Sequence, residues 1–327
     1  MERNGRVIEA VYRGIYRLEV PLPNNPLRAM NSYIIKAPGR NLIIDTGMNR
    51  KECIEVTEEG LGRLNINLAD TDFFVTHMHS DHCGLVSDLA APTSRIYCSQ
   101  LDGEVINSGS DGKRMVPLAA THGFPDPEDA IAKHPGFKYN VTQKIRYNPV
   151  KDRDLLTIGD CRFMCIATPG HTRGHICLYE TKDKLLVAGD HILKKITPNI
   201  SLWSYTYNPL RDYLMSLDKV DAMDVNLVLP GHRMLIENHR QRIDQLKIHH
   251  KNRAAEILTI LQKGEQDAYT IATQMKWDLS YENWDEFPIQ QKWFATGEVI
   301  SHLKYLEETA LVTHKLVNQV MKFSLIH

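Results

Sequence analysis

The residues best suited to chemistry lie in one short segment, Thr76-His77-Met78-His79-Ser80-Asp81-His82-Cys83-Gly84. Four potential metal ligands fall within six positions, and imidazole and carboxylate are ligand types that suit zinc, iron and related ions. Side chains two residues apart on an extended segment share a face, so we expect His77 and His79 to point the same way. Asp81 and His82 follow where the chain turns into a helix, in position to serve a second ion.

Three further candidate ligands, His171, Asp190 and His232, each come directly after an apolar run that closes in glycine. In layered α/β proteins, ligands gather at the ends of strands, where loops meet above a rigid sheet. We therefore expect these three residues to join the first four in one metal centre.

Several neighbouring residues are interpreted as supporting or structural. Gly84 is expected to let the backbone pass close to the site. His175, four residues after His171, is expected to orient a ligand or stabilise the turn, and His191 is interpreted in the same way. Cys83 is interpreted as a buried bystander, because the histidine and aspartate set is complete without it.

The elements that must position these residues alternate between strands and helices as far as about residue 235. Apolar alternation and turn residues predict strands at 15–20, 32–35, 41–45, 72–76, 95–98, 155–158, 161–168, 176–180, 184–188 and 225–229. Helical spacing predicts helices at 50–64, 84–89 and 210–222. The candidate ligands then lie at the ends of predicted strands.

The pattern changes after about residue 235, where helical spacing dominates. It predicts helices at about 243–261 and 269–277 and a third that begins at Pro288, followed by a small hairpin within 310–325. Three helices and a hairpin in about 80 residues are typical of a winged-helix unit.

Composition limits the class of protein. The 327 residues are 43% hydrophobic and 24% charged, which is typical of a folded chain with one large and one small domain. A net charge of -1 gives no pull toward a polyanion, so no nucleic-acid partner is expected. Neither a secretory signal nor a stretch of ~20 apolar residues is present, and the six cysteines lack paired spacing. These features predict a cytoplasmic protein with reduced thiols and no membrane partner.

The motif His77-x-His79-x-Asp81-His82, together with His171, Asp190 and His232, resembles the metallo-β-lactamase superfamily over roughly residues 7–235. The resemblance implies an α/β (α+β) fold, a four-layer αβ/βα sandwich in which two mixed sheets pack face to face beneath outer helices. The last 80 residues resemble the winged-helix domain of the glyoxalase II and β-lactamase-like branch. The expected domains are therefore 1–236, catalytic, and 237–327, winged-helix-like.

The resemblance also implies a role for each ligand. It implies that three histidines, His77, His79 and His171, bind a first ion. It implies that an aspartate and two histidines, Asp81, His82 and His232, bind a second ion, and that Asp190 bridges the two. Asp45, in Asp45-Thr46-Gly47, resembles the superfamily's hydrogen-bonding partner of the ligands. The expected cofactors are two divalent ions, zinc in the first place and iron or manganese as alternatives.

Such a centre predicts a hydrolase. Two cations that share a carboxylate can share a water, whose pKa falls from about 15.7 to near 7 on metal binding. We expect the resulting metal-bridging hydroxide to attack a small-molecule carboxylic ester, thioester or lactone. Asp81 or Asp190 would then carry a proton toward the leaving group.

The irregular segments 102–150 and 193–209 are the expected walls of the pocket, because loops on a rigid scaffold set specificity. Trp203, Tyr205 and Tyr207 alternate along the second segment, so they either face the substrate, where a hydroxyl can donate to an oxyanion, or pack as ordinary aromatic residues.

Three other functions stay open. A phosphodiesterase or nuclease would use the same two ions, and its support is a basic run that a solvated helix face explains more simply. That run is Arg240, Arg242, Lys247, Lys251 and Arg253. A mononuclear iron persulfide dioxygenase resembles the first motif but needs fewer ligands. A DNA-binding regulator is the third.

The role of the C-terminal part is also open. It would pack on the catalytic domain, cover the pocket or build a homodimer. Trp277, Trp284 and Trp293 are candidate anchors for such an interface.

Overall fold

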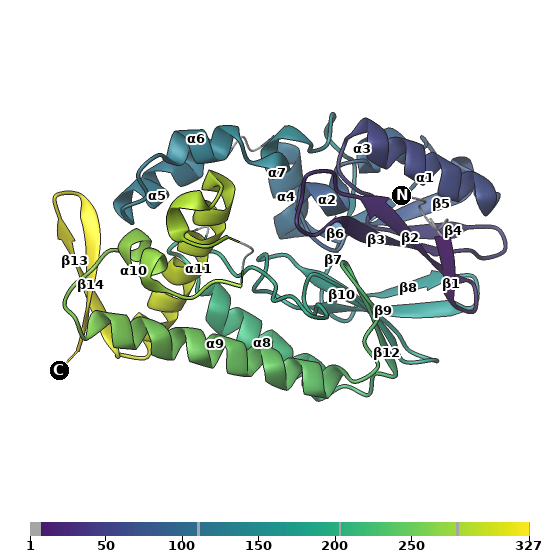
Figure 1. The fold of residues 1–327 in the computed structure, drawn as a ribbon. Coiled ribbons are helices and arrows are strands. Elements are labelled where there is room, and N and C mark those ends of the chain that lie inside the picture. Colours follow the sequence, from purple (N-terminus) through teal and green to yellow (C-terminus); the bar gives the residue numbers. More distant parts are fainter. Residues whose placement is uncertain (1–7, 110–111, 203, 279–280, 327) are drawn as a thin grey trace.

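The structure is a computed structural model that describes residues 8–109, 112–202, 204–278 and 281–326. Two β-sheets pack face to face in one half of the molecule, on the right of Figure 1. The first sheet has seven strands in chain order, and the second has five in the order β12-β11-β10-β9-β8. The strands of the first sheet are β1 (Ile8–Tyr12), β2 (Ile15–Pro21), β3 (Ala29–Ile35), β4 (Asn41–Ile44), β5 (Thr71–Phe74), β6 (Ile96–Ser99) and β7 (Asn148–Val150). Those of the second are β8 (Leu155–Ile158), β9 (Cys161–Ala167), β10 (Ile176–Glu180), β11 (Leu185–Gly189) and β12 (Leu227–Pro230).

Both sheets are mixed. Strands β1 to β4 pair antiparallel, whereas β4 to β7 pair parallel. In the second sheet, β8 to β11 pair antiparallel and β12 pairs parallel with β11. The strands predicted at 176–180 and 184–188 are present as β10 and β11, which pair as an antiparallel hairpin.

Alternation along the strands produces the layers, since successive side chains point to opposite faces of a sheet. In β11, Leu185 and Val187 enter the apolar cluster between the sheets, whereas Leu186 and Ala188 enter the cluster on the outer face. Helix α1 (Lys51–Arg63) covers the outer face of the first sheet, and α8 (Pro209–Asp221) covers that of the second. The predicted four-layer α/β sandwich is confirmed.

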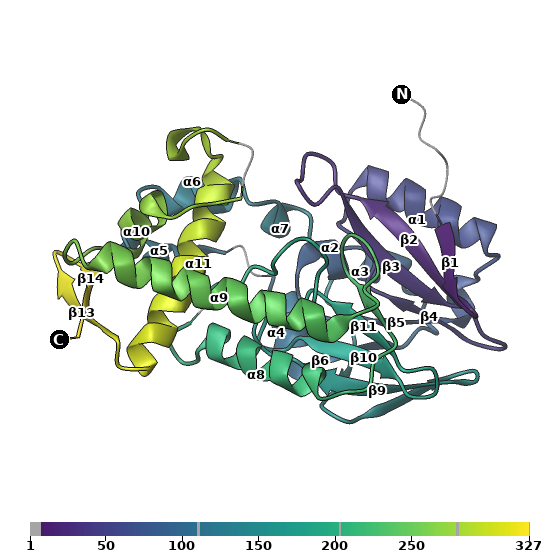
Figure 2. The same ribbon diagram turned by 60° about the horizontal axis from the view of Figure 1, so that its bottom comes forward.

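Local signals explain where the outer helices begin. Asn208 caps α8 by accepting a hydrogen bond from the backbone N–H of Arg211, and Pro209 occupies the first helical position. Asn238 caps α9 (His239–Leu261) by accepting from the N–H of Gln241. Helices α8 and α9 lie side by side, as Figure 2 shows.

The structure differs from the predictions in details. Strands β1 and β7 were not anticipated, because both lie at sheet edges and β7 contains Pro149. The helix predicted at 84–89 is present as the short helix α3 (Val86–Leu89), and a separate short helix, α2 (Ser80–Cys83), precedes Gly84. The intervening segment holds α4 (Gln100–Ser108), α5 (Val116–Thr121), α6 (Pro127–Ala132) and α7 (Pro135–Lys138).

The C-terminal part contains the expected three helices and hairpin: α9, α10 (Ala268–Gln274), α11 (Ile289–Glu308), β13 (Val312–Val317) and β14 (Val320–Leu325). Helix α9 joins it to the sandwich, because Ile243 and Leu246 pack under the second sheet while Ile257 and Ile260 pack in the C-terminal cluster. Trp293 of α11 packs among residues of α5 and α6. Among the described residues, no helix is both long and apolar enough to cross a membrane.

Candidate metal centre

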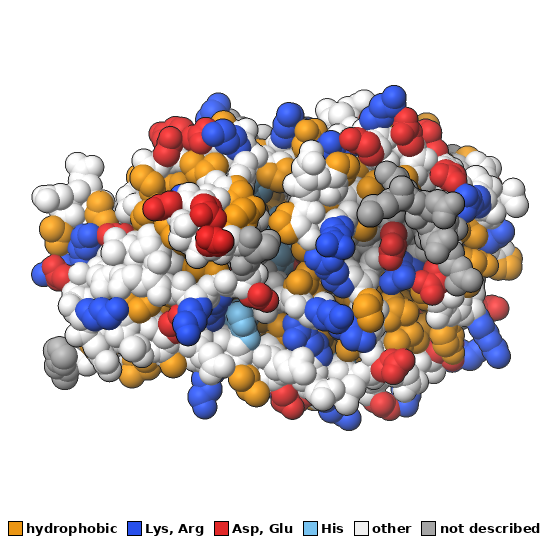
Figure 3. All heavy atoms as spheres, viewed as in Figure 1, with side chains coloured by type: hydrophobic (Ala, Val, Ile, Leu, Met, Phe, Trp, Pro, Cys, Tyr) orange, Lys and Arg blue, Asp and Glu red, His pale blue; other side chains and the backbone are white. Residues whose placement is uncertain are grey.

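Seven candidate ligands from four separate segments of the chain meet where strands of both sheets end. His77 follows β5, His171 follows β9, Asp190 follows β11 and His232 follows β12. Figure 3 shows histidine atoms in a recess near the middle of one face, with hydrophobic side chains around it. The meeting of loops at the strand ends, expected from the sequence, is therefore present.

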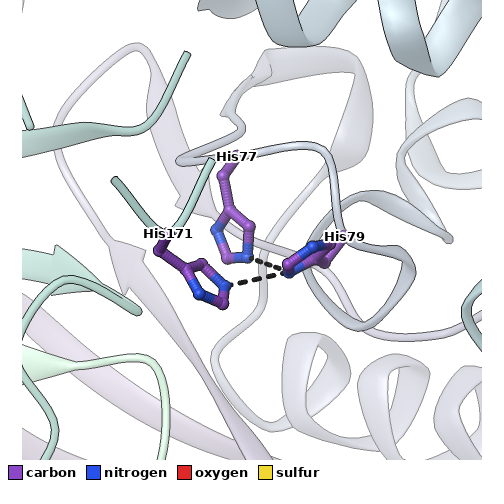
Figure 4. Close-up of side chains that lie close together, drawn as sticks. All are labelled: His77, His79 and His171. Carbon is purple, nitrogen blue, oxygen red and sulfur yellow. Dashed lines mark hydrogen bonds between the residues drawn. The ribbon is translucent and has the colours of Figure 1, made fainter. Parts of the chain in front are cut away.

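Three histidines form the first group of ligand atoms (Figure 4). The Nδ1 atom of His79 lies 3.1 Å from Nε2 of His77 and 2.9 Å from Nε2 of His171. The three rings meet nearly edge to face. Nitrogens from two separate loops are thus directed at one point.

Two histidines and two aspartates form the second group. The carboxylate of Asp81 lies 3.4 Å from Nε2 of His232 and 3.8 Å from Nε2 of His82. Asp190 joins both groups, because Oδ1 lies 3.5 Å from Nε2 of His82 and Oδ2 lies 3.6 Å from Nε2 of His171. Asp190 therefore lies between the two groups and faces both.

Hydrogen bonds on the outer side of the rings decide which nitrogen faces the centre. His171 Nδ1 donates to the carbonyl oxygen of Asn199 at 2.8 Å, and His232 Nδ1 donates to that of Ala29 at 2.8 Å. A carbonyl only accepts, so the proton sits on Nδ1 and the Nε2 lone pair is free for a cation.

Asp45 also fixes the ring orientation of one ligand in each group. Its Oδ2 accepts from His82 Nδ1 at 2.7 Å and from the Thr76 hydroxyl at 2.8 Å, while Oδ1 accepts from the Thr76 N–H at 2.8 Å. Thr76 Oγ1 in turn lies 3.0 Å from Nδ1 of His77. One carboxylate that is 2% exposed thereby orients both rings.

The donor set fits metal ions. Nε2 of His82, Nε2 of His232 and Oδ1 of Asp190 are buried, and none has a hydrogen-bond partner. Buried polar atoms without partners are costly, and their clustering indicates a group that completes them. Nitrogen and carboxylate oxygen donors within 4.8 Å of one another suit divalent cations.

Electrostatics agree with this fit. Burial and the neighbouring imidazoles hold the pKa of His77 well below its usual value and that of His79 at about 3. Burial lowers the pKa of His232, but the facing carboxylates outweigh it and raise that pKa to about 10. A cation bound between Asp190 and His232 would take the place of that proton.

His175 and His191 lie behind the ligands. His175 Nε2 accepts from the backbone N–H of Asp190 at 3.2 Å, and its Nδ1 lies 2.8 Å from the Thr168 hydroxyl. His175 therefore holds the start of the loop that carries Asp190. His191 is fully buried against Tyr213.

Asp102, at the start of α4, is a site residue that the sequence analysis missed. It is 2% exposed and accepts from the N–H of Met78, the hydroxyl of Thr172 and the N–H of Gly174 at 3.0, 2.6 and 3.0 Å. It ties the loop of His77 and His79 to the loop of His171. An aspartate in a helical first turn carries no local sign of this function.

The remaining candidates have other contacts. Burial raises the pKa of the Cys83 thiol well above its usual value, in keeping with an unreactive bystander. The Tyr205 hydroxyl is bonded to His122 and Met321, so this side chain is engaged with the C-terminal hairpin. Tyr207 packs against the Arg173 guanidinium, 4.9 Å from its ring centre. Trp203 lies outside the described residues.

Comparison with known proteins agrees with the geometry. The family model described as metallo-beta-lactamase superfamily matches residues 26–232. A solved metallo-beta-lactamase family protein from Thermus thermophilus is 27% identical, with a TM-score of 0.83, and the match covers 97% of this chain and 100% of that one.

The curated relatives include proteins with functional names. A probable metallo-hydrolase, YqjP, from Bacillus subtilis is 25% identical over 297 residues, 86% of this chain and 88% of the relative. The acyl-coenzyme A thioesterase MBLAC2 from Bos taurus is 24% identical over 215 residues, 62% of this chain and 72% of the relative.

Proposed function

The chain belongs to the metallo-beta-lactamase superfamily and is a hydrolase, and from this premise we propose that it cleaves a small thioester at a centre with two divalent cations. The observation that carries the proposal is the position of Asp190, whose two oxygens face His82 and His171 from opposite ligand groups. A carboxylate that faces both groups is the arrangement that two neighbouring cations require.

The cations, zinc in our proposal and iron or manganese as alternatives, would supply a Lewis acid and a water of lowered pKa. The chain's own residues prepare the site for them. Asp45 and the carbonyl oxygens of Ala29 and Asn199 keep the ring protons of the ligands on the outer side. His175 holds the loop of the proposed bridge.

The choice of a thioester follows from the leaving group. Asp81 and Asp190 both face histidines of the centre, which leaves neither as a free acid for a poor leaving group. A thiolate, whose conjugate acid has a pKa of about 8.5, needs less protonation than an alkoxide or amine. Relatives named as thioesterases support the same class.

The basic run on α9 does not favour a nucleic-acid substrate. Arg242 donates to the carbonyl oxygens of Leu193 and Ile196, and Lys247 pairs with Asp218. Arg253 lies over the ring of Trp277. With these groups engaged inside the chain, we propose a small-molecule substrate and no nucleic-acid partner.

The remaining assignments are also proposals. We propose the division into 1–236 and 237–327, with three helices and a hairpin forming a winged-helix unit of the glyoxalase II and β-lactamase-like branch. Six unpaired thiols support a cytoplasmic location without a membrane partner. The tryptophans proposed as interface anchors contact their own chain, so they give a homodimer no support.

The test combines metal content, by plasma mass spectrometry, with hydrolysis of thioesters, lactones, esters and bis-p-nitrophenyl phosphate. We expect about two ions per chain, fastest turnover of thioesters, and loss of both metal and activity in Asp190→Ala. Turnover confined to the phosphodiester would favour the nuclease. One iron per chain with oxygen consumption on a persulfide would favour the dioxygenase.

A further inference from the structure

The orientation of His171 depends on the segment around Asn199. The ring donates from Nδ1 to the backbone carbonyl of Asn199, which lies 28 residues further along the chain. This carbonyl is the acceptor that directs Nε2 of His171 toward His79, at 2.9 Å. Whatever holds residue 199 therefore also aims one ligand of the first group.

The side chain of Asn199 attaches that segment to the C-terminal helix α11. Its Nδ2 donates to the carbonyl oxygen of Phe294 at 3.3 Å, and its Oδ1 accepts a hydrogen bond from the hydroxyl of Ser201. A carboxamide can donate to one neighbour and accept from another at once, which a carboxylate or an alkyl side chain cannot do. Asn199 uses both capacities.

Gly297, one turn further along α11, permits this attachment. A Cβ at this position would lie 2.8 Å from Oγ and 3.2 Å from Cβ of Ser201. Glycine is among the least favourable residues inside a helix. The close approach of another segment explains why a glycine stands at this position of α11. The missing side chain lets Ser201 lie against α11 and reach Asn199.

We propose that Asn199 is a positioning residue through which helix α11 sets the orientation of the metal ligand His171. The C-terminal part of the chain then contributes to the geometry of the metal centre without supplying a ligand. The inference rests on the proposed metal centre. It goes beyond that proposal by assigning a function to Asn199 and Gly297, which are not among the proposed metal ligands.

The test measures metal affinity of the full-length protein by competition with a chelating dye, and the visible spectrum of the cobalt form. Loss of an outer hydrogen-bonding partner typically weakens a metal site 10- to 100-fold. Because Asn199→Ala keeps the carbonyl and loses its two anchors, we expect one of the two ions to bind about 10-fold more weakly. We also expect the cobalt spectrum to change.

Asn226→Ala is the matched control. Asn226 also donates from Nδ2 to a backbone carbonyl, that of Asp183, at 3.0 Å, but it lies before β12, at the opposite end of that strand from His232. We expect this variant to keep wild-type affinity for both ions. Gly297→Ala is a second, independent variant. It should weaken the same ion as Asn199→Ala although alanine favours the helix.

The outcomes separate the two proposals. Wild-type affinity and spectrum in both Asn199→Ala and Gly297→Ala would overturn the positioning role, as would an equal effect of Asn226→Ala. Wild-type protein that binds two ions but hydrolyses no thioester would overturn the substrate proposal alone, since the metal titration needs no substrate. Wild-type protein that binds no metal would overturn both.

Discussion

Replacement of Asp45 offers the sharpest test of how the centre is built. Its carboxylate accepts three hydrogen bonds, from His82 Nδ1, the Thr76 hydroxyl and the Thr76 N–H. Its backbone has a φ of 60°, in the left-handed region that asparagine and aspartate tolerate better than most residues. Replacement by asparagine therefore changes the hydrogen bonds and keeps a residue that tolerates this backbone. Replacement by alanine removes the hydrogen bonds and strains the backbone as well.

Asp45→Asn should affect metal binding above all. The metal-bound form needs the amide oxygen toward His82 and the Thr76 hydroxyl, which places the amide NH₂ group against the Thr76 N–H. An unsatisfied buried donor costs about 1–3 kcal/mol. Without metal the amide can turn over, so the cost falls on the bound form, and we expect affinity to drop about 5- to 150-fold.

Asp45→Ala should affect folding above all. Alanine in the left-handed backbone conformation costs about 1–2 kcal/mol of stability. It also leaves His82 Nδ1 and the Thr76 N–H without their acceptor whether or not metal is bound. The free energy of unfolding should therefore fall by several kcal/mol, while metal affinity of the folded protein falls less than in Asp45→Asn.

The assay compares dye-competition affinity with urea unfolding for both variants, and Asp72→Asn is the control. Asp72 is also a fully buried carboxylate, paired with Arg40 at 2.6 Å and with Arg95 at 2.7 Å, but it lies in β5 before the ligand loop. It should lose stability and keep its metal. The reasoning is refuted if Asp45→Asn binds both ions like wild type, or if Asp45→Ala loses affinity more than Asp45→Asn.

Three further predictions concern closely packed residues. Burial raises the pKa of Glu298, but its contacts with His249 and Arg253 outweigh burial and lower that pKa to about 2. The contribution of about 3 kcal/mol to stability should be present above pH 4.5 and be lost as pH falls toward 2. Glu298→Gln should remove this acid dependence from urea midpoints, and an unchanged slope would contradict it. Gly84→Ala would place a Cβ 2.5 Å from a backbone oxygen and should cost about 2 kcal/mol or more together with metal. Gly62→Ala, with no atom within 4 Å, should be harmless, and equal behaviour of the two would count against the argument. Asp102→Ala leaves three donors without an acceptor and should cost about 3 kcal/mol by urea unfolding; a loss below about 0.5 kcal/mol would show that water replaces the carboxylate.

The sequence alone predicted the candidate ligands and most of the strands and helices that carry them. The segment from His77 to His82 carries its signal in its own spacing, and Asp190 stands out because a short apolar strand precedes it. Alternation in the strands and helical spacing in α1 and α8 are local properties too. Local patterns of this kind predict which elements form and which residues stand at their ends.

Only the tertiary structure revealed what holds the ligands in place. Asp102 meets Met78 and Gly174 across separations of 24 and 72 residues, and Asn199 reaches Phe294 across 95. Tyr205, which alternation placed equally well toward a substrate or in the core, contacts the C-terminal hairpin. Hydrogen bonds between distant loops depend on how the layers pack. Local spacing along the chain does not predict which distant residues that packing brings together.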